Sequence, residues 1–203
     1  MSDLVGRVAA QPKTVYRGRR VKKLPPAELL ELTDDRWTPR ALFEGLRVPF
    51  TIDVAASEKN TKCERFFDRA ADGLIQSWAG EIVWCNPPYS NIGAWLEKGH
   101  VEMARGCRRV TYLLPANRTE QTWWHDFVEP WRDDELGIET VYIKGRVRFE
   151  CATGVVKSES GARGGKKNKG GAQPPFASVF IHFTQPWRVP LVVMQGELFG
   201  GGS

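Results

Sequence analysis

The four residues Asn86-Pro87-Pro88-Tyr89 are the part of the sequence whose types are best suited to chemistry. They directly follow residues 82–85, a short apolar run with β-branched and aromatic side chains that predicts a buried strand. In open α/β sheets, ligands bind at the carboxyl ends of the strands, so a motif at this position is where a site is expected. On these residues alone, a plain Pro-Pro turn that ends a strand stays open as the alternative.

The motif suits a reaction at an amino nitrogen whose lone pair is delocalised into a ring. The side-chain carbonyl of Asn86 and the backbone carbonyl of Pro87 can accept the two N–H hydrogens and stabilise the charge that grows as the nitrogen takes up a methyl group. The proline rings fix φ and so hold the backbone acceptor in place. Tyr89 offers a face on which a base can stack, once that base has been flipped out of a duplex.

The elements that would position this motif alternate between strands and helices. Short apolar runs predict strands at 50–55, 82–85, 110–114, 140–143 and 176–183, and helical spacing predicts helices at 38–46, 91–106 and 119–130. This alternation predicts an α/β fold with a mostly parallel sheet flanked by helices. The last two strands, near 140–149 and 176–183, are joined by a segment without a helix signal, so we expect an antiparallel C-terminal hairpin at one edge.

Two irregular basic segments accompany this predicted core. Residues 1–30 contain Pro25-Pro26 and carry no acid between residues 13 and 23, which predicts a flexible basic arm. From about residue 152 to 175, a stretch rich in glycine and lysine cannot bury enough apolar surface to offset its chain entropy, which predicts a mobile basic loop. We therefore expect residues 31–203 to form a single domain that carries this loop.

Composition is compatible with a nucleic-acid partner but does not specify one. The chain has 203 residues, which is enough to bury one sizeable hydrophobic core. Its formal net charge of +5 does not repel a polyanion such as nucleic acid. The four cysteines include no C-x-x-C pair, and the three histidines are isolated, so we expect reduced thiols and no metal site. No window approaches the roughly 18 apolar residues of a membrane span, so we expect a cytoplasmic protein without a membrane partner.

Asp/Asn-Pro-Pro-Tyr after a strand is the catalytic motif of amino-methyltransferases, and the chain resembles the phage-type DNA N-6-adenine methyltransferases, the Dam-like family. The resemblance covers roughly residues 36–184. Besides Asn86 to Tyr89 it rests on Trp37-Thr38-Pro39, residues 50–57, Asp72-Gly73-Leu74 with Trp78, and residues 113–119, 145–149 and 175–178. It implies transfer of a methyl group from S-adenosylmethionine to adenine N6 in DNA. It also implies a phage or prophage protein in the cytoplasm of a bacterial host, as in restriction-modification systems.

The resemblance further implies a class I, Rossmann-like methyltransferase in which Asn86, Pro87, Pro88 and Tyr89 are catalytic. By position, Asp53 and Ala55 would belong to the cofactor pocket and Asp72 would hydrogen-bond the cofactor adenine. Trp37, Thr38 and Pro39 would touch the methionine end of the cofactor. Structural alternatives stay open for these residues: a cap or turn for Asp53, a turn for Asp72 and a helix N-terminus for Thr38-Pro39.

The chain also departs from the wider methyltransferase pattern. The glycine-rich turn after the first strand is replaced by Val54-Ala55-Ala56-Ser57, and the short spacing from Asp53 to Asp72 leaves little room for the strand that supplies a ribose-binding acid. Glu58 and Glu64 are candidates for that contact, although each is also typical of a solvated surface charge. No separate target-recognition domain is visible, so we expect the loops and the two basic segments to read the sequence of double-stranded DNA. Candidate phosphate-binding residues are Arg118, Arg146, Arg148, Lys166 and Lys167.

Other functions share parts of this pattern. Cytosine N4, RNA adenine and protein glutamine all present a conjugated nitrogen that the motif can accept. The basic segments favour nucleic acid, and cytosine N4 enzymes more often have serine in place of Asn86, so adenine is the favoured target. A DNA-binding protein that keeps a methyltransferase core only as a scaffold is the alternative from a different class, and the intact motif argues against it.

Overall fold

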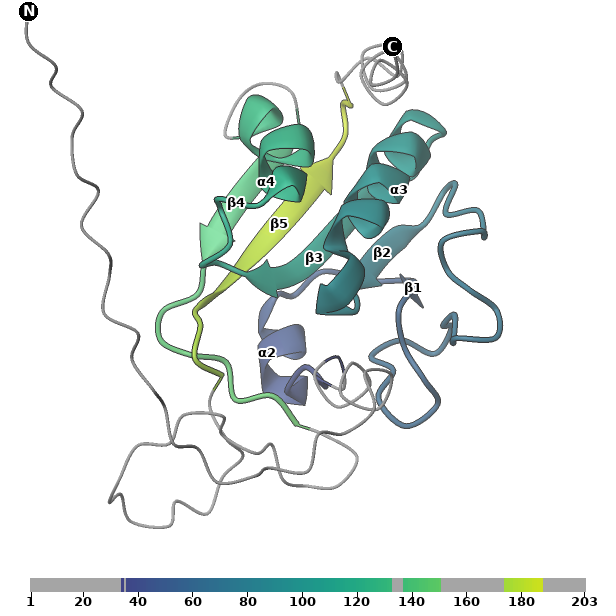
Figure 1. Ribbon diagram of the computed structural model, residues 1–203. Coiled ribbons are helices and arrows are strands. Elements are labelled where there is room, and N and C mark those ends of the chain that lie inside the picture. The colour runs from purple at the N-terminus through teal and green to yellow at the C-terminus, as the bar shows by residue number, and fades with distance from the viewer. Residues whose placement is uncertain (1–33, 35, 133–136, 151–173, 188–203) are drawn as a thin grey trace, which may run out of the picture.

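Five strands form one mixed sheet in the computed structural model, which describes residue 34 and residues 36–132, 137–150 and 174–187. The strands are β1 (Ile52–Asp53), β2 (Ile82–Cys85), β3 (Arg109–Pro115), β4 (Ile138–Tyr142) and β5 (Ser178–Thr184). Their order is β1-β2-β3-β5-β4, with β1, β2 and β3 parallel and β5 antiparallel to both of its neighbours. The carboxyl ends of the three parallel strands therefore meet at one edge of the sheet (Figure 1).

Two helices cover one face of this sheet. Figure 1 shows α3 (Ile92–Ala104) and α4 (Thr122–Phe127) lying together in front of the strands. The buried positions of α3 recur at helical spacing and pack on the inward residues of β2, β3 and β5; they include Ile92, Trp95, Leu96, Gly99 and Met103. A side chain at Gly99 would run into the hydroxyl of Tyr112, so this glycine allows α3 to approach β3 closely.

The opposite face of the sheet is centred on Trp84 of β2. Its indole meets Phe43 of the short helix α2 (Arg40–Gly45) at 5.3 Å between ring centroids, Phe50 at 5.6 Å and Phe180 of β5 at 6.3 Å. Successive residues of β2 thus point to opposite cores, as the alternation of a strand requires. The strand that leads into Asn86 is consequently fixed from both sides.

The predicted elements are present, with two differences in the sheet. The strand expected over 50–55 is reduced to two residues. The second difference concerns the C-terminal strands: β4 and β5 pair antiparallel, as expected, but β5 lies inside the sheet and β4 is the edge. Burial explains this order, because six of the seven residues of β5 are buried whereas β4 has three exposed residues.

The remaining predictions of organisation fall largely outside the described residues. This holds for the basic arm at 1–30 and for all but the last two positions of the predicted loop at 152–175. Two 3-10 turns complete the described elements: η1 (Tyr89–Asn91), which includes the last residue of the motif, and η2 (Glu129–Trp131). In the described ranges, no helix is both long and apolar enough to cross a membrane.

Candidate active site

Asn86 directly follows β2, and only the nitrogen of its side-chain amide has a hydrogen-bond partner. Its Nδ2 donates a hydrogen bond of 2.6 Å to the backbone carbonyl of Arg36. Its Oδ1 is buried and has no hydrogen-bond partner. Because a carbonyl can only accept, the NH2 group must face Arg36, and this fixes Oδ1 as a vacant acceptor on a residue that lines a pocket.

Tyr89 is held by contacts to its ring and to its hydroxyl. The ring meets Phe149 and Phe176 edge-on, with centroids 6.4 and 5.9 Å away, and the hydroxyl donates to the carbonyl of Leu113 in β3 at 3.3 Å. Burial raises the pKa of Tyr89 well above its usual value, so the hydroxyl stays protonated. The guanidinium of Arg36 lies over the ring, 5.5 Å from its centroid.

One pocket collects six of the ten catalytic and cofactor candidates that the sequence singled out. Its lining comprises Asp34, Arg36, Trp37, Thr38, Asp53, Ala55, Asn60, Lys62, Trp84, Asn86 and Pro88. Pro39 is the N-cap of α2 and Pro87 is buried, and neither belongs to this lining. Like Asn86 Oδ1, the hydroxyl of Thr38 is buried without a partner. The pocket therefore joins two catalytic candidates to four cofactor candidates, and two of its lining residues carry a buried polar atom without a partner.

Asp53 is a buried carboxylate at the end of β1, only 3% exposed. It accepts backbone hydrogen bonds from Lys62 at 3.0 Å and from Ala55 at 3.4 Å. Burial raises the pKa of Asp53 to about 7, against the opposing effect of these two hydrogen bonds and of the Lys62 charge. Asp53 therefore changes charge near neutral pH, and it can respond to a ligand that brings a positive charge or a donor.

Asp72 lies outside the pocket lining but on a segment packed against it. The residue has a φ of +51°, and its carboxylate accepts the N–H of Leu74 at 3.1 Å, a local turn contact. A Cβ on Gly73 would collide with the backbone carbonyl of Val54, so the segment closely approaches the turn that follows Asp53. The turn alternative considered for Asp72 is thus present, and it is compatible with a ligand contact by the same carboxylate.

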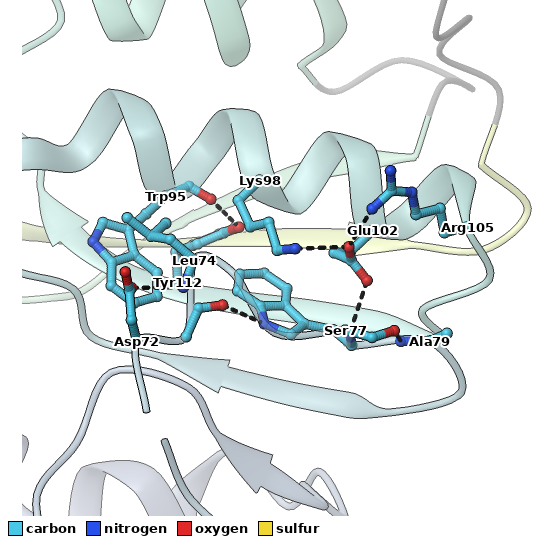
Figure 2. A network of polar contacts seen from close by, with 11 residues as sticks. Asp72, Leu74, Ser77, Ala79, Trp95, Lys98, Glu102, Arg105 and Tyr112 are labelled. Carbon is cyan, nitrogen blue, oxygen red and sulfur yellow. Dashed lines mark hydrogen bonds and ion pairs between the residues drawn. The ribbon is translucent and has the colours of Figure 1, made fainter. Parts of the chain in front are cut away.

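A buried ionic network ties this segment to α3 (Figure 2). Trp78 donates its indole N–H to the carbonyl of Gly73 at 3.0 Å and its backbone N–H to Glu102 at 2.7 Å. The fully buried Glu102 carboxylate also accepts from Lys98 at 2.8 Å and Arg105 at 3.2 Å. Burial opposes ionisation of Glu102, but these hydrogen bonds and the Lys98 charge outweigh it and lower its pKa. The sequence motifs gave no sign of this network.

The candidate phosphate-binding residues that the structure describes are exposed. Arg118 lies on the surface shortly after β3. Arg146 and Arg148 alternate with buried Val147 and Phe149, so they project from the outer side of a segment whose inner side packs on Tyr89. Lys166 and Lys167 are outside the described residues. Two of the five candidates are therefore close in the chain to a ring that contacts the motif.

Sequence reasoning did not name five residues of the pocket lining as site candidates: Asp34, Arg36, Asn60, Lys62 and Trp84. The two acids considered for the ribose contact, Glu58 and Glu64, are exposed and do not belong to the lining. Asn60 could have been noticed as a turn residue, because its Oδ1 accepts the backbone N–H of Ser57 at 2.6 Å. Within the described ranges, no group of three or more metal-ligating side chains is present.

Comparison with known proteins gives a consistent family. The family model of DNA N-6-adenine-methyltransferase (Dam) matches residues 27–200. A DNA N-6-adenine-methyltransferase of Escherichia phage T1 is 36% identical over 90 residues, which are 42% of this chain and 37% of that protein. A protein of the same name from Haemophilus phage HP1 (strain HP1c1) is 41% identical over 141 residues, 66% of this chain and 74% of that protein. The chain thus spans well under half of the first relative and about three quarters of the second.

Proposed function

This chain belongs to the DNA N-6-adenine-methyltransferase (Dam) family, and we propose that it methylates the N6 of adenine in DNA at the pocket that follows β2. The observation that carries the proposal is the vacant, buried Oδ1 of Asn86, whose orientation is fixed by the hydrogen bond from Nδ2 to Arg36. An acceptor held in this way is suited to an N–H donor supplied by a substrate. The exocyclic amine of adenine is such a donor.

S-adenosylmethionine is the methyl donor in this proposal, and it supplies a methyl group activated by a positively charged sulfur. The pocket fits such a molecule, because it combines the buried carboxylate of Asp53 with the unpartnered hydroxyl of Thr38. Trp37, Thr38, Asp53 and Ala55 would hold the cofactor. Pro39 and Asp72 would act at its margins, since neither belongs to the lining.

In this proposal, each residue of the motif has a different role toward the target base. Asn86 Oδ1 and the carbonyl of Pro87 each accept a hydrogen bond from one of the two N6 hydrogens. These hydrogen bonds direct the nitrogen lone pair toward the methyl group and stabilise the cationic amine as it forms. Pro87 and Pro88 keep the backbone rigid. Tyr89 stacks on the flipped base. No strong base is required, because the nitrogen loses its proton after it has become cationic.

The proposal extends to the fold and the partners. The antiparallel β5 between β3 and β4 of an otherwise parallel arrangement supports a class I, Rossmann-like methyltransferase with a C-terminal hairpin. We take residues 31–203 as its single domain, with the arm and the loop as basic appendages. Exposed Arg118, Arg146 and Arg148 would contact phosphates of duplex DNA, in the cytoplasm of a bacterial host.

The experiment that tests this function is a chemical analysis of DNA. DNA from cells that express the protein, in a strain without adenine methylation of its own, is digested to nucleosides and separated by mass spectrometry. We expect N6-methyladenine, absent from cells that carry the empty vector. N4-methylcytosine in its place would move the target to cytosine. Neither nucleoside, with the protein folded and expressed, would overturn the proposal.

A further inference from the structure

Asp34 and Arg36, the described residues of a short segment before α2, are attached to the two ends of the catalytic motif. At the start of the motif, the carbonyl of Arg36 accepts the side-chain N–H of Asn86 at 2.6 Å. Just beyond its end, the carboxylate of Asp34 accepts the backbone N–H of Ser90 at 3.2 Å and the Ser90 hydroxyl at 2.6 Å. Asp34 and Arg36 both line the pocket. The segment is therefore placed to influence what reaches Asn86 and Tyr89.

The side chain of Arg36 lies where the aromatic faces of the site are. Its guanidinium carbon is 5.0 Å from the ring centroid of Phe176 and 5.5 Å from that of Tyr89, within the range of cation–π attraction. A guanidinium is flat and stacks on aromatic rings much as a base does. Phe176 and Tyr89 are themselves neighbours, 5.9 Å apart, so the cation contacts two walls of one aromatic site.

We propose that Arg36 is the gate of the base site: its guanidinium occupies the face of Tyr89 in the DNA-free protein, and the flipped adenine displaces it. This inference rests on the proposed function, in which the base stacks on Tyr89. Two flat groups cannot lie on the same part of one ring face, so the side chain must leave as the base enters. The Arg36 carbonyl can stay, because rotation of the side chain does not require the bond to Asn86 to break.

The two parts of Arg36 thus have different effects. The backbone carbonyl orients Asn86 and helps the reaction, whereas the side chain competes with the base and weakens its entry. Substitution removes the side chain and leaves the backbone carbonyl in place. An Arg36→Ala variant should consequently bind a target base more tightly, which is the opposite of what is expected for an arginine that binds DNA phosphates.

The test measures binding to two duplexes that differ only at the target nucleotide. The methylated sequence is first mapped in DNA from cells that express the protein. A fluorescent duplex with this sequence, and a copy that lacks only the target adenine base, are then titrated with wild-type and variant protein in the presence of S-adenosylhomocysteine. With Arg36→Ala we expect about threefold to thirtyfold tighter binding of the intact duplex, the range of a cation–π contact, and unchanged binding of the duplex that lacks the base.

The possible outcomes separate the gate from other roles. Weaker binding of both duplexes would overturn it in favour of a phosphate contact. Weaker binding of the intact duplex alone would overturn it in favour of an arginine that clamps the base. Arg36→Met, which keeps the length of the side chain without the flat cation, should behave like Arg36→Ala and guards against a folding defect. An absence of mapped N6-methyladenine would overturn the proposed function itself, whereas methylation with a wrong affinity pattern would overturn only the gate.

Discussion

Glu102 and Asn86 are two buried polar side chains with opposite environments. The Glu102 carboxylate accepts hydrogen bonds from Lys98, Arg105 and the backbone of Trp78, so each of its oxygens has a partner. The Oδ1 of Asn86 has none. A buried acceptor without a partner costs on the order of 1–3 kcal/mol, so it persists where a ligand can satisfy it. The comparison indicates that α3 is built for stability and that the edge after β2 is built for binding.

The largest expected effect is on the stability of the α3 region. Glu102→Ala removes the acceptor of Trp78 and leaves Lys98, whose side chain is only 12% exposed, without its counter-charge. Loss of one partner of a buried pair typically costs about 3–5 kcal/mol, so chemical denaturation should show a much less stable protein.

Arg105→Ala is the matched control for this prediction. Its side chain is 63% exposed, and its contact to Glu102 should contribute no more than about 1 kcal/mol. If Glu102→Ala were as stable as Arg105→Ala, the network would not be what fixes the segment from Gly73 to Trp78, and α3 would not differ from the site in the way proposed.

The next effect is on catalysis and concerns Asn86, the buried side chain whose Oδ1 has no partner. Asn86→Ala removes the vacant acceptor Oδ1 and, with it, the single hydrogen bond from Nδ2 to the Arg36 carbonyl, so the free energy of unfolding should fall by only about 0.5–1.5 kcal/mol. Methyl transfer should fall by roughly a hundredfold or more, the usual loss for one preorganised group that stabilises developing charge. Single-turnover methylation and denaturation of the same preparation give both quantities.

Asn86→Asp sharpens this prediction, because it keeps an acceptor at Oδ1 but replaces the donor that binds the Arg36 carbonyl. We expect activity between those of the wild type and Asn86→Ala, with an unchanged affinity for S-adenosylmethionine in calorimetry. A destabilised Asn86→Ala with normal turnover would reverse the contrast between Asn86 and Glu102.

Much of the site could be predicted from sequence because its signals are local. A strand followed directly by Asn86-Pro87-Pro88-Tyr89 is a contiguous pattern, and the spacing of Ile92, Leu96 and Met103 suffices to predict α3. These features depend on residues within one or two turns of each other. The sheet order was harder, because the placement of β5 inside the sheet depends on burial summed over distant strands.

The contacts that orient the site could not be predicted in this way. Arg36 and Asn86 are 50 positions apart, and neither residue type signals that a backbone carbonyl of one will hold the amide of the other. The Glu102 network is hidden for the same reason, since Lys98, Glu102 and Arg105 look like an ordinary charged helix surface. It becomes a buried network only when Trp78 packs against α3.

Asp53 gives an effect on stability that depends on pH. Its pKa of about 7 means that the folded protein prefers the protonated form relative to an unfolded chain with a value of 3.8. The stabilisation that Asp53 contributes is therefore fully present below pH 3.8 and is lost as the pH rises through about 7. Asp53→Asn should flatten the dependence of stability on pH across this window.

The same titration should govern the affinity for S-adenosylmethionine, since the ionised carboxylate is the form suited to a cationic ligand. We expect affinity to fall as pH drops below about 7, by at most about tenfold per pH unit. Calorimetry between pH 5.5 and 8.5 measures it, and Asp53→Asn should bind weakly with little pH dependence. An equal slope in the variant would assign the titration to another group.

Substitution of the Tyr89 hydroxyl has the smallest expected effect. Tyr89 also tests the contrast between Glu102 and Asn86 within one side chain, because it combines a satisfied polar group with a ring proposed to bind the base. Its hydroxyl is satisfied by the carbonyl of Leu113 at a long 3.3 Å, while its ring faces the site. Tyr89→Phe loses only the hydrogen bond, about 0.5–1.5 kcal/mol of stability, and should keep most of the turnover. Tyr89→Ala also loses base stacking, worth roughly 1–3 kcal/mol, so its KM for DNA should rise by about tenfold or more. If Tyr89→Phe were as inactive as Tyr89→Ala, with both variants folded and both binding S-adenosylmethionine, the hydroxyl would have to act in the reaction and not as an anchor to β3.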